Sequence, residues 1–260
     1  MGIEPGVHAL LAPVPGVRTF TQARRPGFAD CAPSGRTRLD ALACWLQDVA
    51  YADVEDAGLA LAALWVVRRT RICVNRFPRF GERFELTTFC SGLGRMWAER
   101  RTDVIRPGAN DADVKAVSLW VHLDAEHLRP APLTAAEIET YGGAPTERRV
   151  SARLRHPLPP VAGAATERRW TFRATECDLA DHVNNAAYWQ PLEEELLAGE
   201  DPQRIDVELE YRTPAQPGEK RVLAEGDRRW IIGSEGELHA TIALWNGDAE
   251  TLAPRNGDDG

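Results

Sequence analysis

A cluster of polar side chains that could do chemistry lies in the stretch DLADHVNNAAYW, residues 178–189. Asp178 and His182 are four residues apart, and the paired asparagines Asn184 and Asn185 follow almost directly. A carboxylate can act as a general base on water or as a nucleophile, and an imidazole beside it can orient the acid or the reactant. This set of side chains suits the hydrolysis of an activated acyl group.

The elements on either side of this cluster strengthen that interpretation. Residues 169–175 are typical of a strand, and a helix is expected to begin just after Asn185, because Asn is a favoured N-cap. A carbonyl oxygen held at the free N–H groups of a helix N-terminus is polarised, and one such donor typically contributes about 3–4 kcal/mol to transition-state stabilisation. A purely structural role also fits the residues, with Asn185 as a cap, Asp178 as a solvated loop acid and His182 in a local hydrogen bond.

The order of elements around the cluster occurs twice along the chain. The first half begins with a strand at residues 17–25 and continues with an amphipathic helix that ends near Gly58. The apolar stripe of this helix consists of Leu39, Leu42, Leu46 and Val49. Turn signals then separate four expected strands, at residues 64–75, 83–90, 96–105 and 114–123. The second half repeats this order, with a strand at 169–175, a helix at 184–199 and strands at 205–211, 220–226, 229–234 and 237–245.

One helix followed by a run of antiparallel strands predicts an α+β unit, in which the helix packs on one curved sheet. A single unit would expose a sheet edge, so we expect the two halves to pair side by side. The predicted division is an N-terminal half at 1–141, a linker at 142–168 and a C-terminal half at 169–260. A short helix with a Thr134–Glu137 capping box ends the first half.

The composition narrows the classes of function. The net charge of −8 argues against general binding of nucleic acid, and no apolar run reaches the roughly 20 residues that cross a bilayer. The five cysteines form no CxxC pair, which is typical of a reduced cytoplasmic protein. We expect no metal site and no cofactor.

Several segments resemble a known family. DLADHVNNAAYWQPLEEEL resembles the hot-dog thioesterases, in which an Asp and a following HVNN segment open the central helix. RLDALACWLQDVAYADVEDAG and the strand segment after it look like the N-terminal hot dog of the acyl-acyl carrier protein (acyl-ACP) thioesterases, as does SLWVHLDAEHLRPAPL, and VELEYR looks like the strand after the catalytic helix. The resemblance spans residues 17–245. It implies a double hot dog, with two long helices each wrapped by a curved antiparallel sheet, and hydrolysis of fatty acyl thioesters.

The resemblance also implies roles for individual residues. Asp178 matches the family's catalytic Asp, His182 matches its catalytic His, and Asn184 and Asn185 match the paired asparagines at the helix start. Plant members carry an Asn where Ala180 stands and a Glu-Cys pair where Pro214 and Ala215 stand, so the plant-type set is incomplete. Cys177 lies near the motif but is more simply read as a packed residue at a strand end.

The first half has no HVNN motif, and its expected role is to shape a tunnel for the acyl chain. The candidate lining residues are Leu42, Ala43, Trp45 and Leu46, which also fit an ordinary core. The expected partner is a fatty acyl thioester of acyl carrier protein or coenzyme A, either of which is anionic and favours nearby Arg side chains. The candidates are Arg68, Arg69, Arg71, Arg148, Arg149, Arg153 and Arg155. A monomer and a homodimer both fit, and the alternatives are a non-catalytic acyl-binding protein and, less favoured, an enoyl-thioester hydratase.

Overall fold

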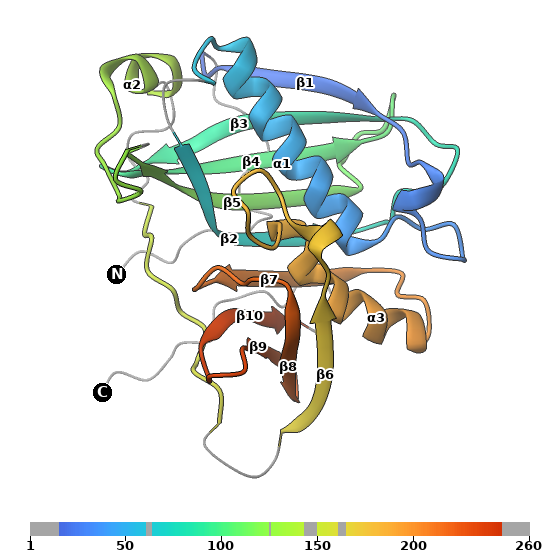
Figure 1. Ribbon diagram of the computed structural model, residues 1–260. Coiled ribbons are helices and arrows are strands. Elements are labelled where there is room, and N and C mark those ends of the chain that lie inside the picture. Colours follow the sequence, from blue (N-terminus) through green and yellow to red (C-terminus); the bar gives the residue numbers. More distant parts are fainter. Residues whose placement is uncertain (1–15, 61–63, 125, 143–149, 161–164, 246–260) are drawn as a thin grey trace, which may run out of the picture.

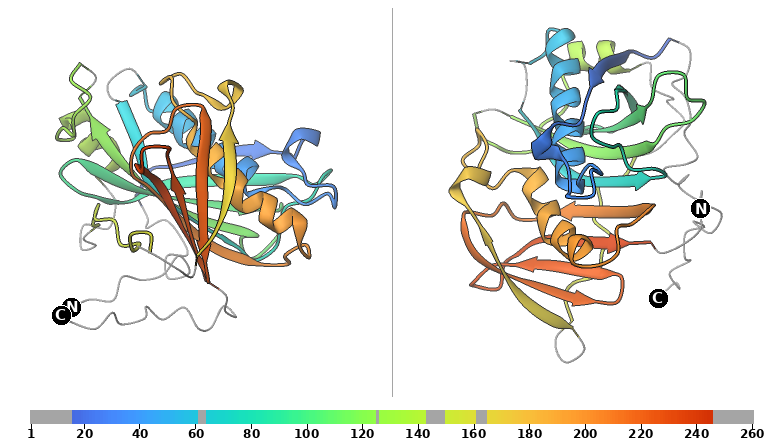
Figure 2. Two further views of the ribbon diagram at one scale, coloured as in Figure 1. Left: turned by 60° about the horizontal axis from the view of Figure 1, so that its bottom comes forward. Right: turned by 90° about the vertical axis from the view of Figure 1, so that its right-hand side faces the viewer.

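Ten antiparallel strands form one continuous curved sheet in the computed structural model, which describes residues 16–60, 64–124, 126–142, 150–160 and 165–245. The strand order is β1-β3-β4-β5-β2-β7-β10-β9-β8-β6. One central helix from each half of the chain packs against the inner face of the sheet (Figures 1 and 2). Both helices contribute to one apolar core.

The first half of the chain contributes β1 (Thr19–Arg24), the short 3-10 helix η2 (Phe28–Asp30), helix α1 (Leu39–Asp56), β2 (Leu64–Val74), β3 (Phe84–Leu93), β4 (Trp97–Ile105), β5 (Val114–Leu123) and helix α2 (Ala135–Tyr141). The second half contributes β6 (Thr166–Phe172), 3-10 helices η3 (Ala174–Glu176) and η4 (Asn185–Trp189), helix α3 (Gln190–Ala198), β7 (Ile205–Tyr211), β8 (Gly218–Glu225), β9 (Arg228–Ile232) and β10 (Leu238–Leu244). Thr134 caps α2 in the predicted capping box with Glu137.

The strand order repeats in mirror image about the middle of the sheet. The first half is arranged as β1-β3-β4-β5-β2, and the second half as β7-β10-β9-β8-β6, so β2 and β7 occupy equivalent places. These two strands pair with each other in antiparallel register and join the halves, as Figure 2 shows. The pairing removes the edge that each half would otherwise expose. It confirms the predicted side-by-side pairing and the double hot-dog class.

The faces of this seam differ in chemistry because side chains alternate along a strand. Ile72 of β2 pairs with Val207 of β7 in register, and both are fully buried in the core. On the alternate positions, Arg71 donates two hydrogen bonds of 2.8 and 2.7 Å to Asp206, and Arg69 lies 3.7 Å from Glu208. Apolar packing on one face and ion pairs on the other therefore hold the halves together.

The helices differ in length, which corrects the expectation of two long ones. α1 has 18 residues and crosses the sheet of the first half, whereas α3 has 9 and is preceded by the five-residue 3-10 helix η4 (Figure 1). Pro191 lies in the first turn of α3, where the missing N–H of proline is tolerated and its φ suits a helix start. The second central helix therefore begins as a 3-10 turn and becomes α-helical only at Gln190. No described helix is both long enough and apolar enough to span a membrane.

The candidate active site

The polar cluster lies on a short closed loop that enters η4. Cys177 and Val183 form an isolated antiparallel bridge. Between these two residues, the Asp178 N–H donates to the His182 carbonyl at 3.0 Å, and the Asp181 N–H donates to the Asp178 carbonyl at 3.0 Å. Asp181 has a positive φ of 57°, a conformation that Asp tolerates better than most residues. The loop is therefore a tight turn with Asp178 at its start.

Two hydrogen bonds fix the carboxylate of Asp178. Its Oδ1 accepts from the Ala180 N–H at 2.9 Å, and its Oδ2 accepts from Asn184 Nδ2 at 3.1 Å. Asn184 is held in turn, because its Oδ1 accepts from the Ala186 N–H at 2.8 Å. Asn184 is thus the N-cap of η4 and also a donor to the acid. The predicted cap was Asn185, so the helix begins one residue earlier than expected.

Asn185 is placed differently from its neighbour. It is the first residue of η4, and its carbonyl accepts a hydrogen bond of 3.0 Å from the Tyr211 hydroxyl. Asn185 also lines a narrow cavity together with Ala43 and Leu46 of α1. His182 is half-buried on the same loop as Asp178, and no residue in the described part of the chain forms a hydrogen bond with its imidazole. The structure therefore brings Asp178 and Asn184 into direct contact, and turns Asn185 toward α1.

The segment after β7 supports this loop from behind. The Ala215 carbonyl accepts from the Val183 N–H at 3.0 Å, and the Ala215 N–H donates to the Tyr188 hydroxyl at 2.8 Å. Burial raises the pKa of Tyr188 to about 12, so that hydroxyl stays neutral. Gln216 donates to the Asp181 carbonyl at 3.1 Å. Ala215 occupies a position where plant relatives are expected to carry a reactive residue, and here it serves as a buried backbone support.

Cys177 precedes the acid and is not activated. Partial desolvation and the nearby carboxylates of Asp181 and Asp178 raise its pKa. A thiol with a raised pKa is a poor nucleophile because the thiolate is the reactive form. Its bridge to Val183 gives it a structural role in closing the loop.

The first half contains a loop of the same geometry, which the sequence reading missed. Cys31 and Thr37 form the equivalent bridge. The Ala32 N–H donates to the Arg36 carbonyl at 2.8 Å, and the Gly35 N–H, at a φ of 85°, donates to the Ala32 carbonyl at 2.8 Å. Ala32 stands where Asp178 stands in the second half. Both loops are seven residues long and begin with Cys, and that repeat is the sequence signal that could have revealed them.

In the first half, Arg36 stands at the position equivalent to His182 and forms ion pairs. The Arg36 side chain is fully buried and lies 2.8 Å from Glu193 of α3, and it also pairs with Asp201. Glu193 in turn accepts from the Leu39 N–H at 3.0 Å, at the start of α1. The first-half loop therefore joins the two helices and carries no acid at the position of Asp178.

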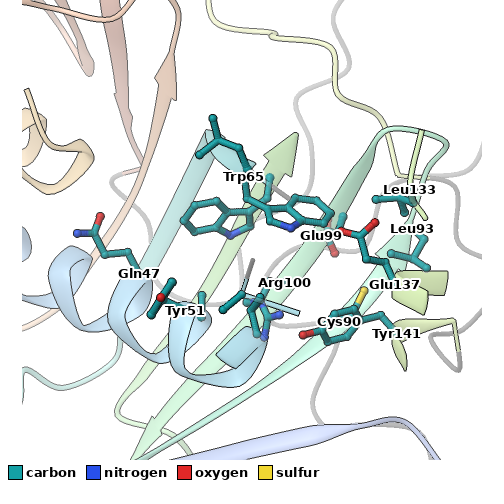
Figure 3. A pocket seen from close by; sticks show the side chains of 16 residues that line it. Gln47, Tyr51, Trp65, Cys90, Leu93, Glu99, Arg100, Leu133, Glu137 and Tyr141 are labelled. Atoms are coloured by element: carbon teal, nitrogen blue, oxygen red, sulfur yellow. The ribbon is translucent and has the colours of Figure 1, made fainter. Parts of the chain in front are cut away.

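Two cavities lie along α1, and the narrow one also borders the second half. The narrow one is lined by Ala43, Leu46 and Gln47 of α1, by Asn185, Ala186 and Tyr211 of the second half, and by Val67, Thr70, Ser118 and Trp120 of the sheet. The second has a volume of about 240 Å³ and shares Gln47 and Trp120 with the first (Figure 3). The two cavities therefore lie next to each other along α1, and Asn185 lines the narrow one.

The four predicted tunnel residues divide into two pairs. Ala43 and Leu46 line the narrow cavity, whereas Leu42 and Trp45 are 1% and 2% exposed in the core and line neither cavity. Gln47 and Trp120, which the sequence reading did not select, line both. A contact between any of these residues and an acyl chain stays a prediction.

The arginines proposed for an anionic carrier are mostly engaged within the fold. Arg68 donates to the Tyr211 and Arg212 carbonyls at 3.0 and 3.1 Å, and Arg69 and Arg71 pair with acids across the seam. Those three are therefore engaged at the seam, and a contact between them and an anionic carrier stays a prediction. Arg153 and Arg155 are exposed. Arg148 and Arg149 lie outside the described residues.

One group of possible metal ligands occurs in the described part of the chain, at His156, Glu208 and Glu210. Each already has protein partners. His156 contacts Thr241 at 2.9 Å and Glu208 at 3.1 Å, and Glu210 accepts from the backbone N–H groups of Arg155 and His156. These bonds fasten the segment between the halves to the sheet.

Comparison with known proteins gives matches in both halves of the chain. The acyl-ACP thioesterase N-terminal domain matches residues 20–141, and the acyl-ACP thioesterase C-terminal domain matches residues 162–243. An uncharacterized protein of Mycobacterium tuberculosis is 28% identical over 204 residues, which cover 77% of this chain and 79% of that protein. A chloroplastic acyl-[acyl-carrier-protein] hydrolase of Cuphea viscosissima is 28% identical over 130 residues, 48% of this chain and 31% of that protein.

Solved structures show the same fold at low identity. The 12:0-ACP thioesterase from Umbellularia californica superposes with a TM-score of 0.70 at 18% identity, covering 87% of this chain and 96% of that one. An acyl-ACP thioesterase from Bacteroides thetaiotaomicron gives a TM-score of 0.69 at 19% identity, with the same coverage. The two domain matches together extend over most of the sequence, in the order of the two halves, and the chain therefore belongs to the acyl-ACP thioesterase family of thioester hydrolases.

Proposed function

We propose that this chain hydrolyses fatty acyl thioesters at the loop of residues 177–184, with Asp178 as the general base or the nucleophile. The observation that carries the proposal is the fixed orientation of the Asp178 carboxylate, which Ala180 and Asn184 hold at 2.9 and 3.1 Å. A half-exposed carboxylate is accessible to water. In the general-base route, it removes a proton from water as that water attacks the thioester carbonyl, and the proton then leaves with the thiol.

The thioester carbonyl is proposed to lie at the start of η4. The Asn185 N–H has no intrahelical partner there, because it is the first helical N–H after the cap. A hydrogen bond to the developing oxyanion is typically worth about 3–4 kcal/mol. In this arrangement Asn184 positions the acid, and Asn185 faces the substrate. His182, on the same loop, is assigned an orienting role toward the water or the thioester.

The acyl chain is proposed to enter the first half along α1. Asn185 lines the narrow cavity, which shares the lining residues Gln47 and Trp120 with the larger one. Each buried methylene contributes about 0.8 kcal/mol, so the apolar walls of these cavities favour a fatty chain. Because Ala32 replaces the acid in the equivalent loop, we expect one active site per chain, at the seam between the halves.

The test is incubation with a panel of acyl-ACP and acyl-coenzyme A thioesters, with free thiol and fatty acid followed together. Stoichiometric release of thiol and acid, with turnover, supports hydrolysis, and the relative rates identify the preferred carrier. Binding of the thioesters without thiol release would identify a non-catalytic acyl-binding protein. Loss of the double bond of an enoyl thioester without thiol release would identify a hydratase. Either of the last two results overturns the proposal.

A further inference from the structure

A buried tyrosine at the end of β7 is bonded to the start of η4. The Tyr211 side chain is 8% exposed, and its hydroxyl lies 3.0 Å from the Asn185 carbonyl and 3.0 Å from Trp189 Nε1. An indole N–H can only donate, and a carbonyl oxygen can only accept. The direction of both bonds is therefore fixed, and the Tyr211 hydroxyl gives its proton to the first peptide group of η4.

The same peptide group is linked to the proposed catalytic acid. The amide between Asn185 and Ala186 presents its carbonyl to Tyr211 and its N–H to Asn184 Oδ1, at 2.8 Å. Asn184 Nδ2 then donates to Asp178 Oδ2 at 3.1 Å. A planar peptide group cannot turn its carbonyl without turning its N–H, and hydrogen bonds in a chain polarise one another. Three consecutive hydrogen bonds therefore connect the Tyr211 hydroxyl with the Asp178 carboxylate.

Tyr211 is itself anchored by the other half of the chain. Arg68 of β2 donates to the Tyr211 and Arg212 carbonyls at 3.0 and 3.1 Å. The Tyr211 ring packs edge-on against the ring of Tyr188, with centroids 5.6 Å apart. The hydroxyl is thus held at the seam, where the first half fixes the backbone of Tyr211 and the second half carries the acid.

The first half offers an internal comparison, because its loop carries no acid. The β2–β7 register, combined with the two-fold relation between the halves, places Asn75 where Tyr211 stands. The Asn75 side chain donates to the Ala112 carbonyl at 3.3 Å, in the loop before β5. Arg38 occupies the N-cap of α1, equivalent to Asn184, and its side chain makes no capping hydrogen bond. At these equivalent positions, the half without the acid therefore has neither the tyrosine nor the capping amide.

We propose that Tyr211 is a positioning residue for thioester hydrolysis. Its hydroxyl holds the first peptide group of η4, and through Asn184 it holds the Asp178 carboxylate in the orientation that the reaction uses. This inference rests on the proposed function, because the acid that Tyr211 positions is the proposed base or nucleophile. Displacing a reacting group by about 1 Å can lower a rate about 100-fold, so loss of the hydroxyl should act on kcat and not on substrate binding.

The first test is Tyr211→Phe, which keeps the ring and removes only the hydroxyl. On a thioester that the wild type hydrolyses, we expect kcat to fall about tenfold, the equivalent of about one net hydrogen bond, with KM unchanged within about twofold. Thr102→Val is the matched control, because it removes a buried hydroxyl bonded to Thr88 at 3.1 Å in β4, and its kcat should equal that of the wild type. Because Tyr211 lines the narrow cavity, a raised KM with unchanged kcat would make it a wall of that cavity only. That result would overturn the inference, and so would wild-type values of both constants.

A double-variant cycle tests whether Tyr211 acts through Asn184. Asn184→Ala already interrupts the chain of hydrogen bonds, so adding Tyr211→Phe to it should lower kcat by less than about twofold. Equal fold losses in the wild-type and Asn184→Ala backgrounds would show that Tyr211 acts independently, and would reject the inference. With 4-aminophenylalanine at position 211, a donor returns to the same ring and most of kcat should be recovered; no recovery counts against donation by the hydroxyl. If Tyr211→Phe does not fold, 4-fluorophenylalanine replaces it in the cycle, because it fills the place of the hydroxyl without a proton to donate.

Failure of the proposed function would give a different result. That function fails if the wild-type protein hydrolyses no thioester, or if Asp178→Asn turns over at the wild-type rate. The role of Tyr211 is then decided by NMR of the Asn184 side-chain amide. Its Nδ2 protons should shift and exchange faster in Tyr211→Phe and not in Thr102→Val. Unchanged Asn184 signals in Tyr211→Phe would reject the inference.

Discussion

Asn184 holds two groups at once, and substitutions there separate the stability of the helix start from the chemistry of the acid. Its Oδ1 caps η4 through the Ala186 N–H at 2.8 Å, and its Nδ2 donates to Asp178 at 3.1 Å. Asn184→Ala removes both contacts. Asn184→Asp keeps a good cap but replaces the donor with a second carboxylate oxygen facing Asp178.

The two variants should therefore rank in opposite order by stability and by activity. Loss of a cap costs about 1 kcal/mol, which lowers Tm by roughly 2–4 °C in a protein of this size, so Asn184→Ala is less stable than Asn184→Asp. Two charges 4 Å apart near a protein surface repel by about 4 kcal/mol. In Asn184→Asp, Asp178 must rotate away or share a proton, so we expect activity at pH 7 to fall about 100-fold, further than in Asn184→Ala.

The assay is urea unfolding and thiol release on the same preparations. Asn110→Asp is the control, because Asn110 is exposed on a turn and the substitution adds the same charge away from the loop. Its activity should equal that of the wild type. If the activity of the two Asn184 variants instead follows their stability, Asn184 is only a cap and the contact with Asp178 has no catalytic role.

Three further outcomes follow from the cavity, the buried ion pair and a buried acid. Ala43→Phe should shorten the preferred acyl chain, because Ala43 lines the narrow cavity and added methylenes occupy its volume. Glu55→Phe, on the exposed face of α1, should leave the preferred chain length unchanged. A folded Ala43→Phe protein with an unchanged chain-length profile counts against a tunnel at that position. Arg36→Met should destabilise the protein by about 3–5 kcal/mol in urea unfolding, because it leaves Glu193 buried without its cation. Adding Glu193→Met should restore part of that stability. A single variant as stable as the wild type would show that the pair does not stabilise the seam. Burial raises the pKa of Asp103 to about 6 from an ordinary value of 3.8, so its contribution to stability falls as the pH rises from about 4 through 6. Asp103→Asn should therefore be more stable than the wild type at pH 8, by on the order of 1 kcal/mol, but not at pH 4. An equal difference in Tm at both pH values would reject this source of pH dependence.

The strands and the first helix follow from the sequence because local pattern and tertiary packing agree there. β5 and β7 begin and end where the sequence predicts, at Val114–Leu123 and Ile205–Tyr211. β6 begins at Thr166, three residues before the expected strand. The second helix is shorter than predicted because residues 185–189 form a 3-10 turn. That distinction depends on the Asn184 cap and on packing, and apolar periodicity does not encode it.

The site was predictable in its residues but not in its contacts. The spacing of Asp178 and the asparagines indicated a loop before a helix, but adjacent asparagines are equally good caps, and only the fold assigns that role to Asn184. On α1, Leu42 and Leu46 belong to the same apolar stripe, and only the position of the partner half decides that Leu46 lines the cavity while Leu42 is buried in the core. The seam arginines required the β2–β7 register, which no local pattern contains.

The most direct test of the account is the rate of thioester hydrolysis by Asp178→Asn. The variant keeps the size of the side chain and removes its charge, and we expect turnover to fall about 10²–10⁴-fold, the usual contribution of a general base. His182→Ala should lose less. Asp181→Asn is the matched control in the same loop, because Asn tolerates the positive φ of 57° at that position, and it should retain activity. Wild-type turnover by a folded Asp178→Asn protein would contradict the assignment of Asp178 as the residue that drives hydrolysis.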